Sequence, residues 1–178
     1  MLDLFDCFAI IGISIILITA FYYQIFFQEL PCALCIFQRI ALSLISFGLI
    51  LNLTYGNKYK HYLFVILVAL LNAAVATTQI LLHIVPGTGS YGDSIFSLHM
   101  YTWSFVVSIV FIIYATVCGL ITPDQNRIKK SFSIISKIAI VLIICLTLAN
   151  TISVFIECGP YLCPSDPNSY WLFELFSK

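Results

Sequence analysis

Two closely spaced pairs stand out among the seven cysteines of the chain. Cys32 and Cys35 are separated by two residues, and Cys158 and Cys163 by four. Such dithiols can close into a disulfide and pass it on to another thiol by thiolate attack. The other cysteines stand alone inside apolar runs, where a thiol is usually an inert packing residue; they are Cys7, Cys118 and Cys145.

The residues around the first pair favour a reactive dithiol at the start of a helix. Pro31 suits the first turn of a helix, where free N–H groups and the helix dipole stabilise a thiolate. Arg39 follows Cys35 by one turn on the same face, and an ionisable residue inside an apolar run indicates a functional site. Its guanidinium can stabilise a thiolate or hydrogen-bond an oxygen of a lipid-soluble acceptor. An inert disulfide is the alternative, and a zinc site built from both pairs is disfavoured in an oxidising compartment.

The second pair lies in a turn-rich segment with Gly159, Pro160 and Pro164. Two interpretations stay open. Either the pair exchanges electrons with the first pair from a mobile arm, or it is a structural disulfide that ties down the tail. Residues 170–176 are aromatic and apolar but too few to span a bilayer, which predicts a short helix in the membrane interface.

The elements that must position these cysteines are membrane helices. Hydrophobic residues make up 61% of the 178 residues and charged residues only 9%, against about 25% charged residues in soluble domains. Five apolar runs approach the roughly 20 residues that a spanning helix needs: 7–27, 36–53, 61–84, 99–121 and 134–156. We therefore predict an all-α integral membrane protein, a bundle of about five transmembrane helices. Residues 1–156 form this domain, residues 157–178 form a tail, and the absence of a basic face excludes nucleic-acid binding.

Both cysteine pairs are expected on the same side of the membrane, because four predicted crossings separate them. The positive-inside rule decides which side. Six Lys and Arg residues lie on one side of the predicted spans, at positions 58, 60, 127, 129, 130 and 137. Only two lie on the other side, at positions 39 and 178. The cysteines thus face outward, where disulfides persist, and the N-terminus faces the cytoplasm. The first run is expected to stay uncleaved, since Asp3 and Asp6 precede it instead of Lys or Arg.

Two histidines flank the glycine-rich outward break, His83 at the end of the third run and His99 at the start of the fourth. A single histidine at a membrane edge is more often an interfacial or packing residue than a functional one, and His99 receives no role. The spans carry no acidic side chain in mid-membrane, and the third has only amides such as Asn72 and Gln79. This argues against an ion-coupled transporter, while a scaffold with structural disulfides stays an alternative.

The segment Pro31-Cys-Ala-Leu-Cys-Ile-Phe-Gln-Arg39 resembles the P-C-x-L-C-x-x-x-R signature of the DsbB family of disulfide-bond-formation membrane proteins. Four further stretches are similar to a branch of that family whose second cysteine pair is C-terminal: residues 79–83, 86–93, 98–103 and 158–167.

The resemblance implies a quinone-linked thiol oxidase of the bacterial inner membrane that reoxidises a periplasmic thioredoxin-fold protein of the DsbA type. By motif position, Cys35 faces the quinone, Cys32 exchanges with the second pair, and Arg39 contacts the quinone. His83 falls near a quinone-site histidine of the family. Ubiquinone and menaquinone both fit this expectation, and no metal is implied. An oxidant at about −120 mV cannot be regenerated by a glutathione pool at about −200 mV, so a membrane quinone is a reasonable electron acceptor.

The chain departs from the best-known pattern of this family, a four-helix bundle with its second cysteine pair between the third and fourth helices. Here that loop holds no cysteine, and the candidate pair follows a fifth span. Which of Cys158 and Cys163 reacts with the partner stays open. The direction of electron flow also stays open, since a membrane thiol reductase could use the same fold.

Overall fold

The computed structural model describes residues 2–84, 92, 94–122, 133–161, 163–165, 167 and 169–176. It contains five long helices, α1 (Leu2–Phe26), α2 (Ala33–Tyr55), α3 (Tyr59–His83), α4 (Met100–Ile121) and α5 (Ile134–Cys158), followed by the short α6 (Trp171–Phe176). Each long helix has 22 to 25 residues and is apolar enough to cross a membrane. The prediction of an all-α membrane protein with five spans is confirmed.

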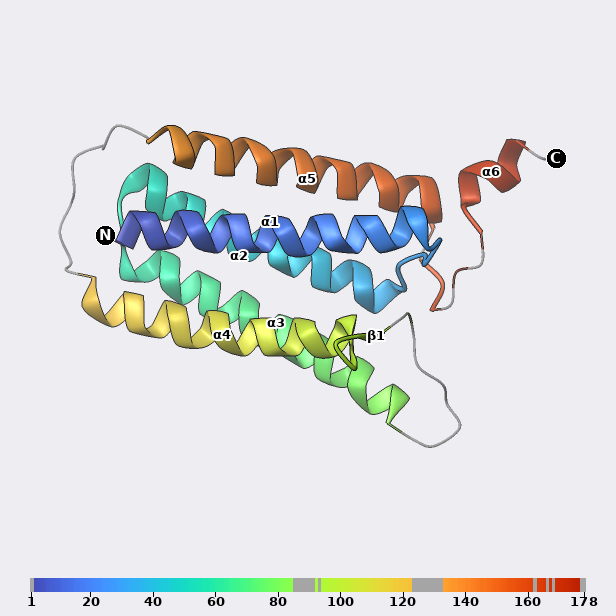
Figure 1. The fold of residues 1–178 in the computed structure, drawn as a ribbon, viewed down its shortest axis with the longest axis horizontal. Helices are drawn as coiled ribbons and strands as arrows, with labels where there is room; N and C mark the ends of the chain where they lie inside the picture. Colours follow the sequence, from blue (N-terminus) through green and yellow to red (C-terminus); the bar gives the residue numbers. More distant parts are fainter. Residues whose placement is uncertain are drawn as a thin grey trace.

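The long helices run lengthwise beside one another, so that the bundle has two ends (Figure 1). α5 packs against α1 and α2, and the α3–α4 pair packs on α2 through α3. One end, here called the cysteine end, holds the start of α2, the end of α3, the start of α4 and the end of α5. The start of α1 and the turn between α2 and α3 lie at the opposite end. Both cysteine pairs therefore share one end, as the count of crossings predicts.

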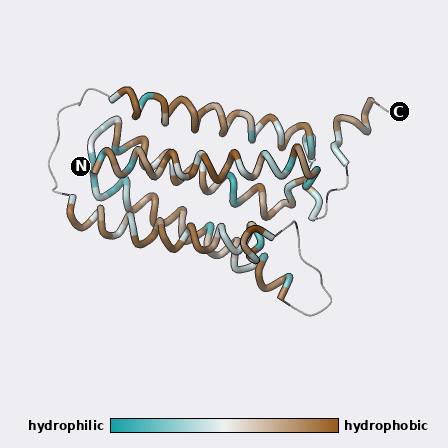
Figure 2. The backbone as a smooth tube through the Cα atoms, viewed as in Figure 1, coloured by the Kyte–Doolittle hydropathy of each residue, from teal (hydrophilic) through white to brown (hydrophobic). Residues whose placement is uncertain are grey.

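The helices form because their apolar side chains favour lipid and their backbone polar groups are bonded within each helix. Figure 2 shows the tube as largely hydrophobic along these helices. Hydroxyl side chains inside the spans find acceptors in the preceding turn. Ser14 Oγ donates to the Ile10 carbonyl at 2.9 Å, and Thr147 Oγ1 donates to the Ile143 carbonyl at 2.8 Å. These two hydroxyls are thus paired within their own helices.

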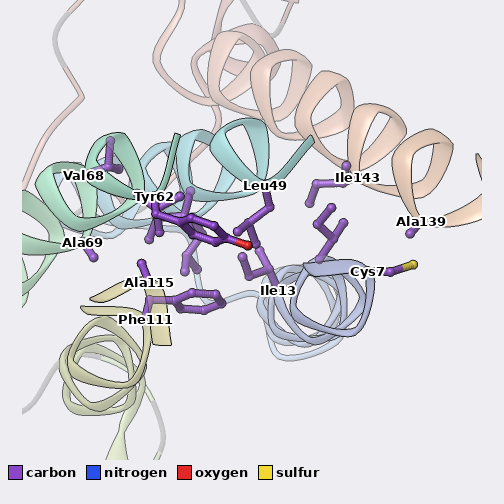
Figure 3. Packing of buried hydrophobic residues seen from close by; sticks show 14 of the residues in the cluster. Cys7, Ile13, Leu49, Tyr62, Val68, Ala69, Phe111, Ala115, Ala139 and Ile143 are labelled. Atoms are coloured by element: carbon purple, nitrogen blue, oxygen red, sulfur yellow. The ribbon is translucent and has the colours of Figure 1, made fainter. Parts of the chain in front are cut away.

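The core draws side chains from all five long helices (Figure 3). Ile13 of α1, Leu49 of α2, Tyr62 of α3 and Ile143 of α5 are almost completely buried, and Phe111 reaches them from α4. The backbones of α2 and α3 approach closely at Gly48, where an added Cβ would lie 2.6 Å from a methyl group of Val65. Small residues at such crossings are typical of helix packing in membranes.

A buried carboxylate joins three elements at the opposite end. Asp6 is completely buried and accepts hydrogen bonds from the Tyr62 hydroxyl at 3.1 Å and the Tyr114 hydroxyl at 2.5 Å. The Asn57 amide also donates to it, at 3.5 Å. Because these donors replace water, α1 includes Asp6 and begins at Leu2, five residues before the predicted start of the span.

A short hairpin precedes α4, which the sequence did not predict. Strand β1 (Ser94–Ile95) pairs antiparallel with β2 (Leu98–His99). Phe96 and Ser97 form the turn with positive φ angles of 49° and 65°. The Trp103 indole N–H donates to the Ile95 carbonyl at 3.0 Å and ties the hairpin to α4. Most of the glycine-rich break, and the basic residues at 127, 129, 130 and 178, lie outside the described residues.

Candidate functional site

The first cysteine pair is a disulfide at the start of α2. The Cα atoms of Cys32 and Cys35 are 5.0 Å apart. Cys32 is the N-cap of α2, and its sulfur accepts a hydrogen bond from the Cys35 backbone N–H at 3.1 Å. Pro31 therefore precedes the cap instead of lying in the first turn, because the Cys32 sulfur takes the capping position. A backbone N–H aimed at a sulfur at a helix N-terminus favours a thiolate there.

One buried amide contacts this disulfide, and a second amide supports it. Gln79 of α3 is 1% exposed, and its Nε2 group donates to the Cys32 sulfur at 3.3 Å and to the Cys35 sulfur at 3.4 Å. Its Oε1 atom accepts a hydrogen bond of 2.7 Å from the Nε2 group of Gln38, which is also buried. The disulfide thus contacts a hydrogen-bond donor from another helix, and a second amide fixes that donor.

Arg39 points inward from α2 and is buried. One guanidinium nitrogen donates to Gln24 Oε1 at 2.7 Å and to Asn150 Oδ1 at 3.5 Å, and the other donates to the Ala20 carbonyl at 3.3 Å. The guanidinium also lies 5.4 Å from the centre of the Phe21 ring. A buried charge requires such partners, so α1 and α5 together hold Arg39 in place.

A buried acid completes the charge distribution around Arg39. Glu157, near the end of α5, is 3% exposed, and neither carboxyl oxygen has a hydrogen-bond partner. Arg39 interacts with it electrostatically. One turn earlier in α5, Ser153 accepts a hydrogen bond from Gln24 Nε2 at 2.8 Å. The inward face of α5 therefore meets the arginine with polar side chains on successive turns.

A cavity of about 400 Å³ opens beside the first disulfide. Its polar lining comes from Cys35, Gln38, Arg39 and Gln79, together with Thr19, Glu29 and Ser104. The rest is largely apolar, with aromatic rings from Tyr23, Phe96, Tyr101 and Trp103. Cavities of this size with a few polar groups and apolar walls suit small organic ligands. Of the two cysteines in the first pair, Cys35 is among the lining residues and Cys32 is not.

His83 and His99 lie against one wall of this cavity. Both rings stack on the ring of Tyr101, with centroids 5.6 Å and 5.3 Å away. Tyr101 lines the cavity, whereas neither histidine belongs to its lining. The structure therefore brings together Cys35 and Arg39 and places His83 behind an aromatic ring. Gln79, one turn before His83, occupies the cavity wall instead.

The second cysteine pair is a disulfide at the end of α5. Cys158 is the last residue of the helix and is buried, while Cys163 is half-buried. Gly159 ends the helix with a φ of 63°, and a Cβ there would lie 2.5 Å from the Trp171 ring. That indole also contacts Tyr161 edge-on, at 6.4 Å between centroids. The first turn of α6 therefore packs directly over the segment that carries the second pair.

Several site residues could not be assigned from the sequence. The sequence assigned no role to Gln24, Gln38 or Glu157, and it placed Gln79 only as an amide of the third span and as part of the stretch 79–83. Their signal is that they are polar side chains within apolar runs, but only the packing of helices shows that they converge.

Of the single cysteines, Cys7 and Cys118 are buried and Cys145 is exposed on α5. Among the described residues, no cluster of three or more His, Cys, Asp or Glu side chains forms a candidate metal site.

Comparison with known proteins gives one finding. A family model described as "Disulfide bond formation protein DsbB" matches residues 4–91, which contain most of α1, all of α2 and α3, and the first cysteine pair. Neither the curated proteins nor the solved structures yield a match.

Proposed function

Because the chain belongs, through residues 4–91, to the DsbB family, we propose that it is a quinone-linked thiol oxidase. It reoxidises a DsbA-type thioredoxin-fold dithiol protein in the periplasm. Two electrons pass from the partner to Cys158–Cys163, then to Cys32–Cys35, and then to a membrane quinone, either ubiquinone or menaquinone. The protein is a multi-pass protein of the bacterial inner membrane.

One observation carries the proposal: Cys35, one half of a redox-capable disulfide, lines a largely apolar cavity. Cys35 lines the cavity together with Arg39, while Cys32 does not. This division supports a role for Cys35 toward the lipid-soluble acceptor and for Cys32 toward the second pair.

The residues of the cavity fit a quinone. Its volume of about 400 Å³ and its aromatic walls suit a substituted ring, and Arg39 offers N–H donors suited to a ring oxygen. When bound, a quinone supplies an acceptor for two electrons and two protons. The chain's own residues hold Cys35 at the wall, place the positive charge of Arg39 beside it, and exclude water with aromatic rings. His83 contributes by stacking on Tyr101.

The exposure of the second pair favours Cys163 as the sulfur that the partner attacks, since Cys158 is buried at the helix end. A partner thiolate forms a bond to the Cys163 sulfur, the Cys158–Cys163 bond breaks, and its electron pair leaves on Cys158. The partner's second thiol then attacks the mixed disulfide, which releases an oxidised partner and two reduced cysteines.

Orientation follows from charge. The cysteine end faces the periplasm in this proposal, because Lys58 and Lys60 lie at the opposite end, where positive residues favour the cytoplasm. The N-terminus, at the start of α1, is then cytoplasmic. The segment from residue 157 onward is the periplasmic tail that meets the partner, and lipid surrounds the spans.

The test is anaerobic mixing of the purified protein with a reduced DsbA-type protein and a soluble quinone analogue, with quinone absorbance as the readout. We expect turnover by the wild type and by Cys145→Ser, whose thiol lies outside both pairs. Cys32→Ser, Cys35→Ser, Cys158→Ser and Cys163→Ser should each abolish it. Quinone reduction by Cys35→Ser at the wild-type rate would refute the mechanism. A protein that keeps both disulfides intact against the reduced partner would instead be a scaffold.

A further inference from the structure

The contacts of Gln79 with both sulfurs of the first pair suggest a role beyond packing. Its Nε2 group lies 3.3 Å and 3.4 Å from the two sulfur atoms, and the side chain is shielded from water. Cys32 has a second donor, the Cys35 backbone N–H. Among the described residues, the side chain that donates a hydrogen bond to the Cys35 sulfur is Gln79. Gln79 and Cys35 also share the cavity wall.

We infer that Gln79 is a catalytic residue that stabilises the thiolate of Cys35, and that Gln38 is the positioning residue that keeps the Gln79 N–H groups turned toward the sulfurs. This inference rests on the proposed function and deepens it, because it names the group that makes Cys35 a good leaving group.

The step in which the amide acts is the exchange between the two pairs. A thiolate of the second pair attacks the Cys32 sulfur, and a new interpair disulfide forms. The Cys32–Cys35 bond breaks, and its electron pair passes to Cys35, which leaves as a thiolate without taking up a proton. Hydrogen bonds to the charged form favour that form, and such bonds are stronger than bonds between neutral groups. The Gln79 N–H group is already within reach of the sulfur on which this charge develops.

The orientation of the Gln79 amide decides whether it helps or hinders. With its oxygen facing the sulfurs, it would oppose the developing negative charge. The Gln38 N–H group prevents this by donating to Gln79 Oε1 at 2.7 Å, which leaves the Gln79 N–H groups for the disulfide. The two amides thus form a short chain that ends at the sulfurs.

Gln79→Met tests the donor, because methionine keeps an unbranched side chain of similar length and has no N–H group. Gln38→Glu tests the orientation. A carboxylate accepts hydrogen bonds only, so it attracts the Gln79 N–H groups and turns the oxygen of that amide toward the sulfurs. Asn72→Leu is the matched control, since Asn72 is a buried amide of the same helix that donates to Ser104 and Ser108 and not to sulfur.

Two readouts need neither quinone nor partner. The first is the equilibrium constant of Cys32–Cys35 against a reference dithiol couple in detergent. The second is the ultraviolet thiolate absorbance of Cys35 at neutral pH in a Cys32→Ser background, with Cys32→Ser/Cys35→Ser as the blank. We expect Gln79→Met to shift the exchange equilibrium constant about tenfold toward the Cys32–Cys35 disulfide, because the reduced form loses a donor to its thiolate. The thiolate absorbance should fall several-fold. Gln38→Glu should move both readouts at least as far, and Asn72→Leu should move neither.

Equal readouts for the wild type and Gln79→Met would overturn the inference, as would equal shifts in Gln79→Met and Asn72→Leu. Should Gln79→Met fail to fold, Gln38→Glu decides alone, and wild-type values in that variant would overturn the inference. The proposed function fails separately, when the wild type does not reduce quinone. In that case the shifts at the first pair would still show the thiolate-stabilising role of Gln79.

Discussion

Arg39 illustrates how single residues define this site. Its guanidinium is buried inside a membrane bundle, yet it has oxygen partners from α1 and α5 and a nearby acid, Glu157. Buried charges without such partners are strongly unfavourable. The arrangement leaves the charge of Arg39 fixed at a cavity wall next to Cys35, where it can bind an electron acceptor.

Replacement of Arg39 should therefore affect acceptor binding more than the exchange of disulfides. We expect Arg39→Ala to raise the KM for a quinone analogue tenfold or more, because a hydrogen bond to a charged group contributes roughly 1.5–3 kcal/mol. Arg39→Lys keeps the positive charge but loses the planar, two-pronged donor geometry of the guanidinium, so its KM should lie between those of the wild type and Arg39→Ala. Steady-state kinetics at fixed partner concentration measures this, with the exposed Lys60→Ala as control. An unchanged KM in Arg39→Ala would exclude the residue from the acceptor site.

At the scale of elements, the hairpin before α4 determines how closed the cavity is. Ile95 and Phe96 contribute to the lining, although Phe96 is 88% exposed over its whole surface. The hairpin has only two residues in each strand, which is too short for independent stability. Its hold on the bundle depends on contacts such as the Trp103 hydrogen bond to Ile95.

Loosening this hairpin should weaken ligand binding. Trp103→Phe keeps an aromatic ring in the cavity wall and removes the N–H donor, a loss of about 1 kcal/mol. We expect the Kd for a quinone analogue to rise about fivefold in an equilibrium titration. Ser97→Gly is the opposite change, because glycine adopts the observed φ of 65° without steric cost. This variant should bind at least as tightly as the wild type, and weakening equal to that in Trp103→Phe would contradict the role of the hairpin.

The hydrogen-bonded Asp6 should stabilise the bundle without influencing the cavity at the other end. We expect Tyr114→Phe to lower the free energy of unfolding by about 1–2 kcal/mol. Asp6→Leu should cost about 3 kcal/mol or more, since it leaves the buried hydroxyls of Tyr62 and Tyr114 without their acceptor. Unfolding in detergent measures both, and ligand titration of the folded variants should give wild-type Kd values. Loss of quinone binding in folded Asp6→Leu would show that the two ends are coupled.

The whole molecule divides its polar features between two ends. The cysteine end contains both disulfides and the cavity, while the opposite end contains the buried carboxylate and the lysines of the turn between α2 and α3. α5 runs between these ends on the side of α1 and α2, and it carries both Asn150, which accepts a hydrogen bond from Arg39, and Cys158 of the second pair. The fifth helix is thus part of the site and not an addition to a four-helix core.

The orientation predicts a labelling pattern in intact spheroplasts. In Cys158→Ser, the thiol of Cys163 is free and should react with a membrane-impermeant maleimide without prior lysis. Lys60→Cys, at the exposed start of α3, should react only after lysis. The mass of the labelled protein distinguishes these cases. Labelling of Lys60→Cys in intact cells together with protection of Cys163 would reverse the orientation and contradict the proposed route.

Much of this architecture could be predicted, because long apolar runs leave few alternatives to spanning helices. The predicted run 134–156 corresponds to α5 at Ile134–Cys158, and 99–121 corresponds to α4 at Met100–Ile121. The largest error concerns α1, where Asp6 was expected to lie outside the helix. Hydroxyl donors from α3 and α4 accommodate that carboxylate. The order of apolar and polar residues along the chain does not show which residues of other helices will lie beside Asp6.

The site was only partly predictable for the same reason. Cysteine spacing and parity indicate the two pairs and their common end. The partners of Arg39, the approach of Gln79 to both sulfurs, and the hairpin over the cavity depend on which helix faces meet. Gln38 and Gln79 are separated by 41 residues in sequence, so only the folded bundle brings their amides together.

One sulfur of the second pair is built into a membrane helix, whereas the other belongs to the loop beyond Gly159. When this bond opens, Cys158 keeps its depth and direction, and Cys163 alone gains reach. The indole of Trp171 packs against Gly159, at the base of this loop. In the proposed exchange, a protein that delivers thiols to Cys163 therefore has to bring its own reactive cysteine close to the end of α5, where the helix holds Cys158.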